Sequence, residues 1–125
     1  MTTRIDLFLN DDQFLSFAAG DVIFREGDEG DTMYAVVAGS VNILVGDRVV
    51  DTTEVGGLVG EMAVIDAQPR SATAVAATDC RLVPINQRRF LFLVQQTPFF
   101  AVQVMQIMAA RHRRLLAEAK GRAGA

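Results

Sequence analysis

The sequence has no tryptophan, one tyrosine, one histidine and one cysteine among its 125 residues. A single cysteine, Cys80, excludes a disulfide within the chain and a cysteine-rich zinc site, and its place between apolar segments predicts a buried, unreactive thiol. The single histidine, His112, lies in a basic stretch far from any activated serine signature, which leaves no basis for a metal cluster or a Ser/His/Asp triad. We therefore expect a binding protein that is not an enzyme and holds neither a metal nor a cofactor.

The sequence also lacks a leader and any apolar run long enough to cross a membrane, which predicts a cytoplasmic protein with no membrane contact. Hydrophobic residues make up 50% and charged residues 22% of the chain, a balance typical of a globular fold. A chain of this length buries about two thirds of its unfolded surface on folding. We expect residues 1–125 to form a single domain.

The net charge is small, and the charged residues are unevenly spread. The net charge of −3 predicts no nucleic-acid partner. Residues 1–31 carry eight acidic and two basic side chains, whereas residues 111–122 carry five basic and one acidic. The basic stretch is either a solvated helix end, where the helix dipole favours cations, or a docking surface for an acidic partner.

Residues 20–85 show short apolar runs separated by glycine and aspartate, for example at Ala38-Gly39-Ser40 and Gly46-Asp47. Closely spaced short strands of this kind predict an antiparallel barrel or sandwich. Before them, residues 1–19 predict a short helical segment, because the aspartates at positions 11 and 12 offer an N-cap. The fold expected at this point is mainly β with flanking helices.

From Asn86 onward the pattern becomes helical, and we expect helices over residues 86–121. Asn86 is a candidate N-cap, Thr97-Pro98 restarts a second, long helix, and Gly121 ends it. Apolar residues at positions 104, 108 and 115 follow a heptad-like seam that Arg111 interrupts. That seam predicts either a stripe facing the core or a two-fold interface with a second copy, and both readings stay open here.

The stretch VGEMAVIDAQPRSATAVA, residues 59–76, is mostly apolar yet places Glu61 and Arg70 nine positions apart. A glycine turn followed by one helical turn aims backbone N–H groups at an anion, and Arg70 can add a bidentate bond to phosphate oxygens. Glu61 repels an anion but accepts a hydrogen bond from a hydroxyl, such as that of a ribose. The segment therefore holds either the sugar-phosphate end of a nucleotide or an Arg70–Glu61 ion pair that only ties down a loop.

These residues resemble a known family. GEMAVIDAQPRSATAVA is similar to the phosphate-binding cassette of cyclic nucleotide-binding domains, which we place at residues 59–72. AGDVIFREGDEGDTMYAVVAGSVNIL resembles the first strands of that family, and FLFLVQQTPFFAVQVMQIMAARHRRL resembles the B and C helices of receptors of the CRP/FNR type. The resemblance implies an antiparallel β-roll (a jelly-roll-like double-stranded β-helix) over residues 20–85, followed by those two helices.

The resemblance also implies roles for individual residues. Glu61 would accept a hydrogen bond from the ribose 2′-hydroxyl, Arg70 would pair with the cyclic phosphate, and Ser71 would donate to the same phosphate. The remaining cassette residues expected at the ligand are Gly60, Met62, Ala63 and Ala72, and those expected more weakly along the base are Ile43, Val50 and Leu115.

Two departures from the family pattern affect the expected function. Polar residues of the long helix contact the adenine in cyclic-AMP receptors, but Leu115 and Leu116 occupy those places here. The triplet Arg70-Ser71-Ala72 is shared with those receptors, so we favour cyclic AMP and keep cyclic GMP as the alternative. The chain ends at Ala125 without room for a helix-turn-helix, so we expect no DNA binding.

We expect a cyclic nucleotide sensor whose helices move when ligand binds and pass that change to a second copy or to an unknown downstream protein. The alternative is an interaction module that dimerises through the long helix and no longer needs ligand.

Overall fold

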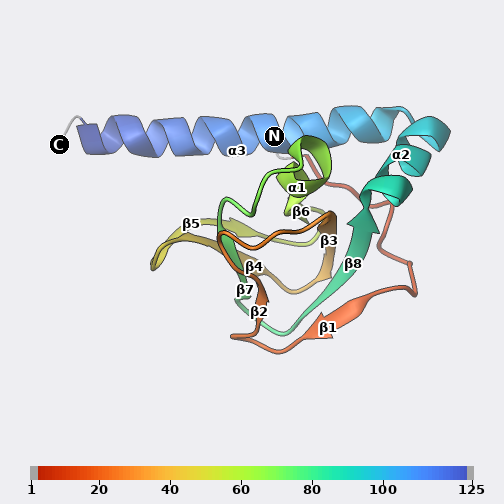
Figure 1. Ribbon diagram of the computed structural model, residues 1–125, viewed down its shortest axis with the longest axis horizontal. Coiled ribbons are helices and arrows are strands. Elements are labelled where there is room, and N and C mark those ends of the chain that lie inside the picture. The colour runs from red at the N-terminus through yellow and green to blue at the C-terminus, as the bar shows by residue number, and fades with distance from the viewer. Residues whose placement is uncertain (1–2, 124–125) are drawn as a thin grey trace.

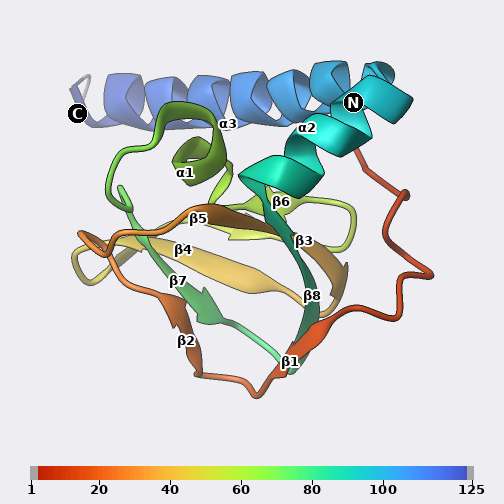
Figure 2. The ribbon, with the colours of Figure 1, turned by 45° about the vertical axis from the view of Figure 1, so that its right-hand side comes forward.

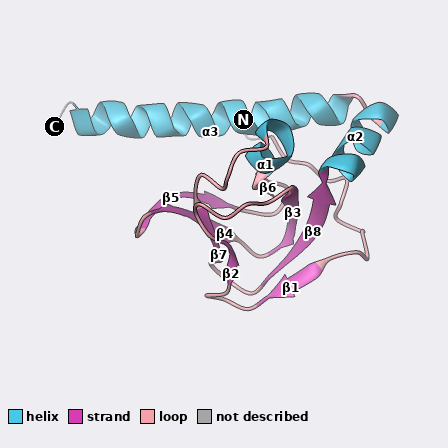
Figure 3. Ribbon diagram, viewed as in Figure 1, coloured by secondary structure: helices cyan, strands magenta, loops and turns pink. Residues whose placement is uncertain are grey.

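The computed structural model describes residues 3–123. Residues 1–2 and 124–125 of the domain predicted over residues 1–125 lie outside the described residues. Two antiparallel four-stranded sheets face each other, and the helices gather on one side of this roll (Figures 1 and 3). The strands are β1 (Leu15–Phe17), β2 (Val22–Phe24), β3 (Thr32–Ala38), β4 (Val41–Val45), β5 (Arg48–Thr53), β6 (Leu58–Val59), β7 (Thr73–Ala76) and β8 (Cys80–Asn86). The helices are α1 (Glu61–Asp66), α2 (Gln87–Gln96) and α3 (Phe99–Ala123).

The strand order is β1-β8-β3-β6 in one sheet and β2-β7-β4-β5 in the other. This arrangement confirms the predicted β-roll. The two faces of strand β3 contribute to different cores: Met33 and Ala35 pack toward the helices, whereas Val36 packs between the sheets. The period-two alternation of a strand thus feeds two separate apolar cores.

The first core joins the β3 sheet to the helices and is centred on Phe100, which is fully buried. Its ring meets the rings of Phe8 and Phe90, each with 5.8 Å between centroids. The second core lies between the sheets and includes Cys80, which is 3% exposed. The predicted burial of Cys80 is confirmed, and burial raises the pKa of its thiol, as do nearby Asp21 and Asp79.

The predicted N-terminal helix is wrong. Over residues 3–19 the chain makes turns and then strand β1, which pairs with β8 through Leu15 opposite Leu82 and Phe17 opposite Cys80. Asp11 accepts a hydrogen bond from the backbone N–H of Gln13, which closes a local turn in place of a helix cap. Pairing with an open sheet edge outweighed the weak local helix signal.

The C-terminal helices are confirmed, with one boundary corrected. The Asn86 side chain caps α2 by accepting from the N–H of Arg89, and after Thr97-Pro98 the chain turns by 119° into α3 (Figure 2). Helix α3 continues through Gly121 to Ala123, because glycine weakens a helix by only about 1 kcal/mol and does not stop it.

Of the two readings of the seam at positions 104, 108 and 115, the core-facing one describes two of the three residues. Val104 is 1% exposed and Met108 packs against the first core, so the core-facing reading is correct for these two residues. Leu115 is the exception, since it is 40% exposed. Any second copy would have to meet a different face of the helix.

We predict that Phe100→Ala lowers the free energy of unfolding by about 3–5 kcal/mol, because it empties the centre of the first core. The neighbouring Phe99 is 59% exposed, so Phe99→Ala is a matched control and should change stability by less than about 0.5 kcal/mol. Urea-induced unfolding measures both, and equal effects for the two variants would contradict the assigned core.

Candidate functional site

A cavity of about 330 Å³ opens between the sheet formed by β4 and β5, the α1 segment and helix α3. Its volume lies at the lower end of the range for small-molecule sites. All ten residues selected from the sequence line it: Ile43, Val50, Gly60, Glu61, Met62, Ala63, Arg70, Ser71, Ala72 and Leu115. The fold therefore brings residues up to 72 positions apart in the sequence, from Ile43 to Leu115, around one space.

Gly60 shapes the turn that leads into α1. Its φ of 75° lies in the left-handed region, which side chains with a Cβ adopt at a cost. A Cβ on Gly60 would also lie 2.6 Å from Nη1 of Arg70. Glycine is therefore required here both for the backbone conformation and for the space that the arginine fills.

Arg70 is a buried cation without a carboxylate partner among the described residues. The residue is 7% exposed. Its guanidinium donates from Nη1 to the Gly60 carbonyl at 3.2 Å and from Nη2 to the Thr32 carbonyl at 2.7 Å. Its Nε atom is buried and has no hydrogen-bond partner in the part of the chain described. Burial lowers the pKa of Arg70, although Tyr34, Asp31 and Asp28 oppose that effect.

Glu61 is 3% exposed and does not pair with Arg70, so the predicted alternative of an Arg70–Glu61 ion pair is not what the fold contains. Its Oε1 accepts a hydrogen bond from Nη1 of Arg111 at 2.5 Å. Its Oε2 is buried and has no partner within residues 3–123. This oxygen can therefore accept a hydrogen bond from a donor on a ligand.

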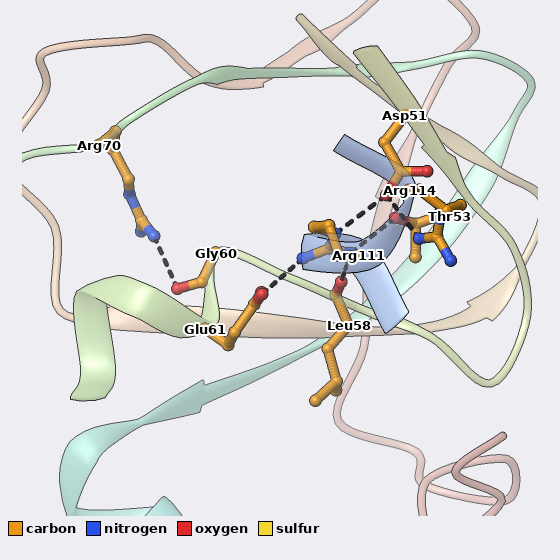
Figure 4. A network of polar contacts seen from close by, with 8 residues as sticks. All are labelled: Asp51, Thr53, Leu58, Gly60, Glu61, Arg70, Arg111 and Arg114. Atoms are coloured by element: carbon orange, nitrogen blue, oxygen red, sulfur yellow. Dashed lines mark hydrogen bonds and ion pairs between the residues drawn. The ribbon is translucent and has the colours of Figure 1, made fainter. Parts of the chain in front are cut away.

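Arg111 was missed as a site residue by sequence reasoning, which placed it in the basic stretch of the long helix, read as a solvated helix end or a docking surface, and as an interruption of the apolar seam. It donates from Nε to Asp51 at 2.9 Å, from Nη2 to the Leu58 carbonyl at 2.9 Å, and from Nη2 to Thr53 Oγ1 at 3.2 Å (Figure 4). Burial alone would lower the pKa of Arg111, but the carboxylates of Glu61 and Asp51 outweigh it and raise that pKa. This guanidinium therefore stays charged and ties α3 to β5, β6 and α1.

A signal for Arg111 was present in the sequence. It follows Val104 by seven positions and Ile107 by four, which places all three on one face of a helix. An arginine on an otherwise buried face needs an acidic partner inside the fold. The sequence did not say which carboxylate that would be.

The residues that sequence reasoning expected along the base form an apolar part of the cavity lining, with Ile43 and Val50 on the strands and Leu115 on α3. Phe24 and Val45 line the cavity as well, and neither was selected from the sequence. Leu116, the second leucine that the resemblance placed near the base, is 45% exposed and is not among the residues that line the cavity.

The cavity thus carries an unsatisfied carboxylate oxygen and a guanidinium without a counter-ion, separated by mostly apolar walls. The family model for the cyclic nucleotide-binding domain matches residues 14–97, which is more than half of the chain and includes the whole cassette. The chain belongs to the cyclic nucleotide-binding domain family.

This cyclic nucleotide-binding domain is 33% identical over 115 residues to a cyclic AMP receptor protein of Thermus thermophilus, a match that covers 88% of the chain and 53% of the relative. It is 45% identical over 71 residues to a cAMP-dependent protein kinase regulatory subunit of Eremothecium gossypii, covering 57% of the chain and 16% of the relative. The crystal structure of the catabolite activator protein of Thermus thermophilus superposes with a TM-score of 0.77 at 31% identity, covering 94% of the chain and 58% of that protein.

The domain therefore spans about half the length, or less, of these relatives. Within the described residues, no single helix is both long and apolar enough to cross a membrane. The pair α2 and α3 meets the length and composition requirement only when joined, and the two are bent by 119° at their junction.

Asp51 of the domain accepts hydrogen bonds from Arg111 at 2.9 Å and from Arg114 at 3.0 Å. Burial raises the pKa of Asp51, but the two arginines outweigh burial and bring that pKa below its ordinary value of 3.8. A lowered native pKa means that the stability contributed by Asp51 is complete above the ordinary carboxyl pKa. That contribution is lost as the pH falls through the native value.

We predict that Asp51→Asn lowers stability at neutral pH and flattens the loss of stability between about pH 5 and pH 2. The measurement is the free energy of unfolding by urea at a series of pH values. Asp47→Asn, in the exposed turn between β4 and β5, controls for the removal of one negative charge. An acid limb as steep as that of the unmodified chain would show that Asp51 contributes nothing to it.

Proposed function

We propose that this domain binds cyclic AMP in the cavity and that binding changes how α3 is held. The observation that carries the proposal is a pair of incomplete groups lining one cavity: Arg70 has no counter-ion among the described residues, and Oε2 of Glu61 has no donor there. A cyclic nucleotide supplies both from one small ring, because its phosphate is anionic and its ribose 2′-hydroxyl donates.

The phosphate end is assigned to Arg70. A guanidinium has five N–H donors, and only two of those of Arg70 are engaged by protein carbonyls among the described residues. A phosphate in this position receives charge-assisted hydrogen bonds and supplies the missing counter-charge. The exposed hydroxyl of Ser71 and the small side chain of Ala72 border the same part of the cavity, where Ser71 adds a donor.

The ribose end is assigned to Glu61. Its free Oε2 accepts from the 2′-hydroxyl while its Oε1 keeps Arg111, so ligand binding does not have to break the ion pair. Gly60, Met62 and Ala63 also line the cavity, and Gly60 and Ala63 leave room for the sugar because they have no side chain or only a methyl group.

The base lies against Ile43, Val50 and Leu115. Guanine carries an oxygen, a ring N–H and an amino group on one edge, whereas adenine carries one amino group and ring acceptors. Burying the more polar edge against three aliphatic side chains costs more free energy, so cyclic AMP is favoured over cyclic GMP. The names of the Thermus and Eremothecium relatives, which refer to cyclic AMP, agree with this preference.

The switch runs through Arg111. Because Glu61 would contact the ligand with one oxygen and α3 with the other, a change in the position or charge distribution of Glu61 reaches α3 directly. The ligand then shifts an existing equilibrium between arrangements of that helix. A module that only dimerises and ignores ligand is the alternative function.

We predict that isothermal titration calorimetry detects cyclic AMP binding and that Arg70→Ala weakens it by about 2–5 kcal/mol, or roughly 30-fold to several thousandfold in Kd, since it removes the partner of a buried charge. Arg113→Ala is the matched control, because Arg113 is an exposed arginine of α3 outside the cavity. Cyclic GMP should bind more weakly than cyclic AMP. No heat with either nucleotide at about 1 mM ligand, where binding energies near 4 kcal/mol are still detectable, would contradict the proposal.

The dimer, if formed, uses the exposed face of α3. Val102, Met105, Ala109 and Leu116 are exposed at the spacing of a two-helix seam, with His112 at the one polar position between Ala109 and Leu116. An exposed apolar stripe of this length on a single helix is suited to a second copy of the same helix across a two-fold axis.

We predict that sedimentation velocity shows a dimer that Met105→Glu converts to monomer, while Ala117→Glu, exposed but beside the seam, leaves it intact. A change in association or shape when cyclic AMP is added supports the switch. Association that is unaffected by cyclic AMP supports the ligand-independent module.

A further inference from the structure

Phe24, the last residue of β2, forms one wall of the slot that holds Arg70. The centre of the Arg70 guanidinium lies 4.1 Å from the centroid of the Phe24 ring, which is contact distance for a cation over an aromatic face. The ring of Tyr34 stacks nearly parallel to the ring of Phe24, with 6.3 Å between centroids and 23° between planes. The ring is therefore itself held in place.

Two glycines complete the slot. A Cβ on Gly30 would lie 2.6 Å from Nε and from Nη2 of Arg70, and a Cβ on Gly60 would lie 2.6 Å from Nη1. The Gly60 Cβ would also come within 3.1 Å of the Phe24 ring. The guanidinium of Arg70 is therefore enclosed by the backbone of the two glycines and by the face of the Phe24 ring. These neighbours leave it one narrow position.

A buried arginine is ordinarily paired with a carboxylate, because an unpaired buried charge is costly. Arg70 makes no ion pair within residues 3–123, although Asp28 and Asp31 are near enough to raise its pKa. A carboxylate bonded to the guanidinium would have to be displaced by an anionic ligand. The face of an aromatic ring attracts the cation without occupying any of its N–H donors.

We propose that Phe24 is a positioning residue for Arg70: its ring stabilises the buried guanidinium in place of a carboxylate and keeps the N–H donors of Arg70 free for an anionic ligand. The part of this inference that concerns ligand affinity rests on the proposed nucleotide binding. The part that concerns the position of Arg70 in the ligand-free protein does not.

The affinity test is a double-mutant cycle read by calorimetry with cyclic AMP. Phe24→Leu keeps the position apolar and removes the ring, so the Arg70 side chain can turn toward Asp28 and Asp31, and binding should weaken roughly 3- to 30-fold. In the Arg70→Ala background the same substitution should change Kd less than about twofold, because no guanidinium remains to be positioned. An equal loss in both backgrounds would overturn the proposal and make Phe24 a direct ligand contact or a cavity wall.

Two variants guard against an effect of folding. Phe92→Leu makes the same substitution at a phenylalanine of α2 that is 57% exposed, and it should leave Kd unchanged. If Phe24→Leu melts before the titration temperature, Phe24→Met repeats the cycle with an unbranched apolar side chain of similar volume.

The position of Arg70 is tested without any ligand by the NMR signal of its Nε–H, assigned by its loss in Arg70→Lys. Over the Phe24 face this signal should be shifted upfield by the ring current, and Phe24→Leu should return it downfield. An unshifted signal in the unmodified protein overturns the inference even if cyclic AMP binds. A shifted signal that depends on Phe24, in a protein that binds no nucleotide, supports the positioning role and rejects the proposed function alone.

Discussion

The hydrogen bonds of the Arg111 guanidinium hold helix α3 against the β-roll and the cassette, and the geometry of the site depends on them. It reaches Asp51 on β5, the Leu58 carbonyl on β6, Thr53 at the end of β5, and Glu61 at the start of α1. These bonds join the long helix to both sheets and to the cassette through one side chain. Because Glu61 is buried and Asp51 is half-buried, movement of α3 away from the roll would expose or unpair both carboxylates.

The polar groups of the cavity are satisfied unequally, and this inequality gives the site its chemistry. Arg111 donates hydrogen bonds from all three of its nitrogen atoms, whereas Glu61 accepts through only one of its two oxygens. Arg70 has two carbonyls and an aromatic face but no counter-ion in the described part of the chain. Incomplete pairing is rare in protein interiors, because each buried group left without a partner costs free energy. Its concentration around one mostly apolar cavity is the basis of the proposed nucleotide binding.

Short-range sequence signals were enough to predict most of the strands and both C-terminal helices. The Gly and Asp punctuation of residues 20–85 predicted the short strands, Asn86 predicted a helix cap through its side-chain oxygen, and Thr97-Pro98 predicted the break between two helices. The N-terminal segment was misread because its helix signal was weak and the open edge of β8 offered Leu15 and Phe17 a partner strand. Pairing with a distant strand leaves little local trace in the sequence.

By itself, the sequence determined which residue types stand in the cassette, since the glycine turn, Glu61 and Arg70 lie within one short segment whose conformation is largely local. Only the tertiary structure decided the partners of those two charged side chains. It placed Arg111 from α3 on Glu61 and the ring of Phe24 from β2 on Arg70. The reason is physical: a buried charge must be stabilised by whatever the packed fold brings within a few ångströms, and residues 46 or 50 positions away become neighbours only when the sheets and helices close around a common core.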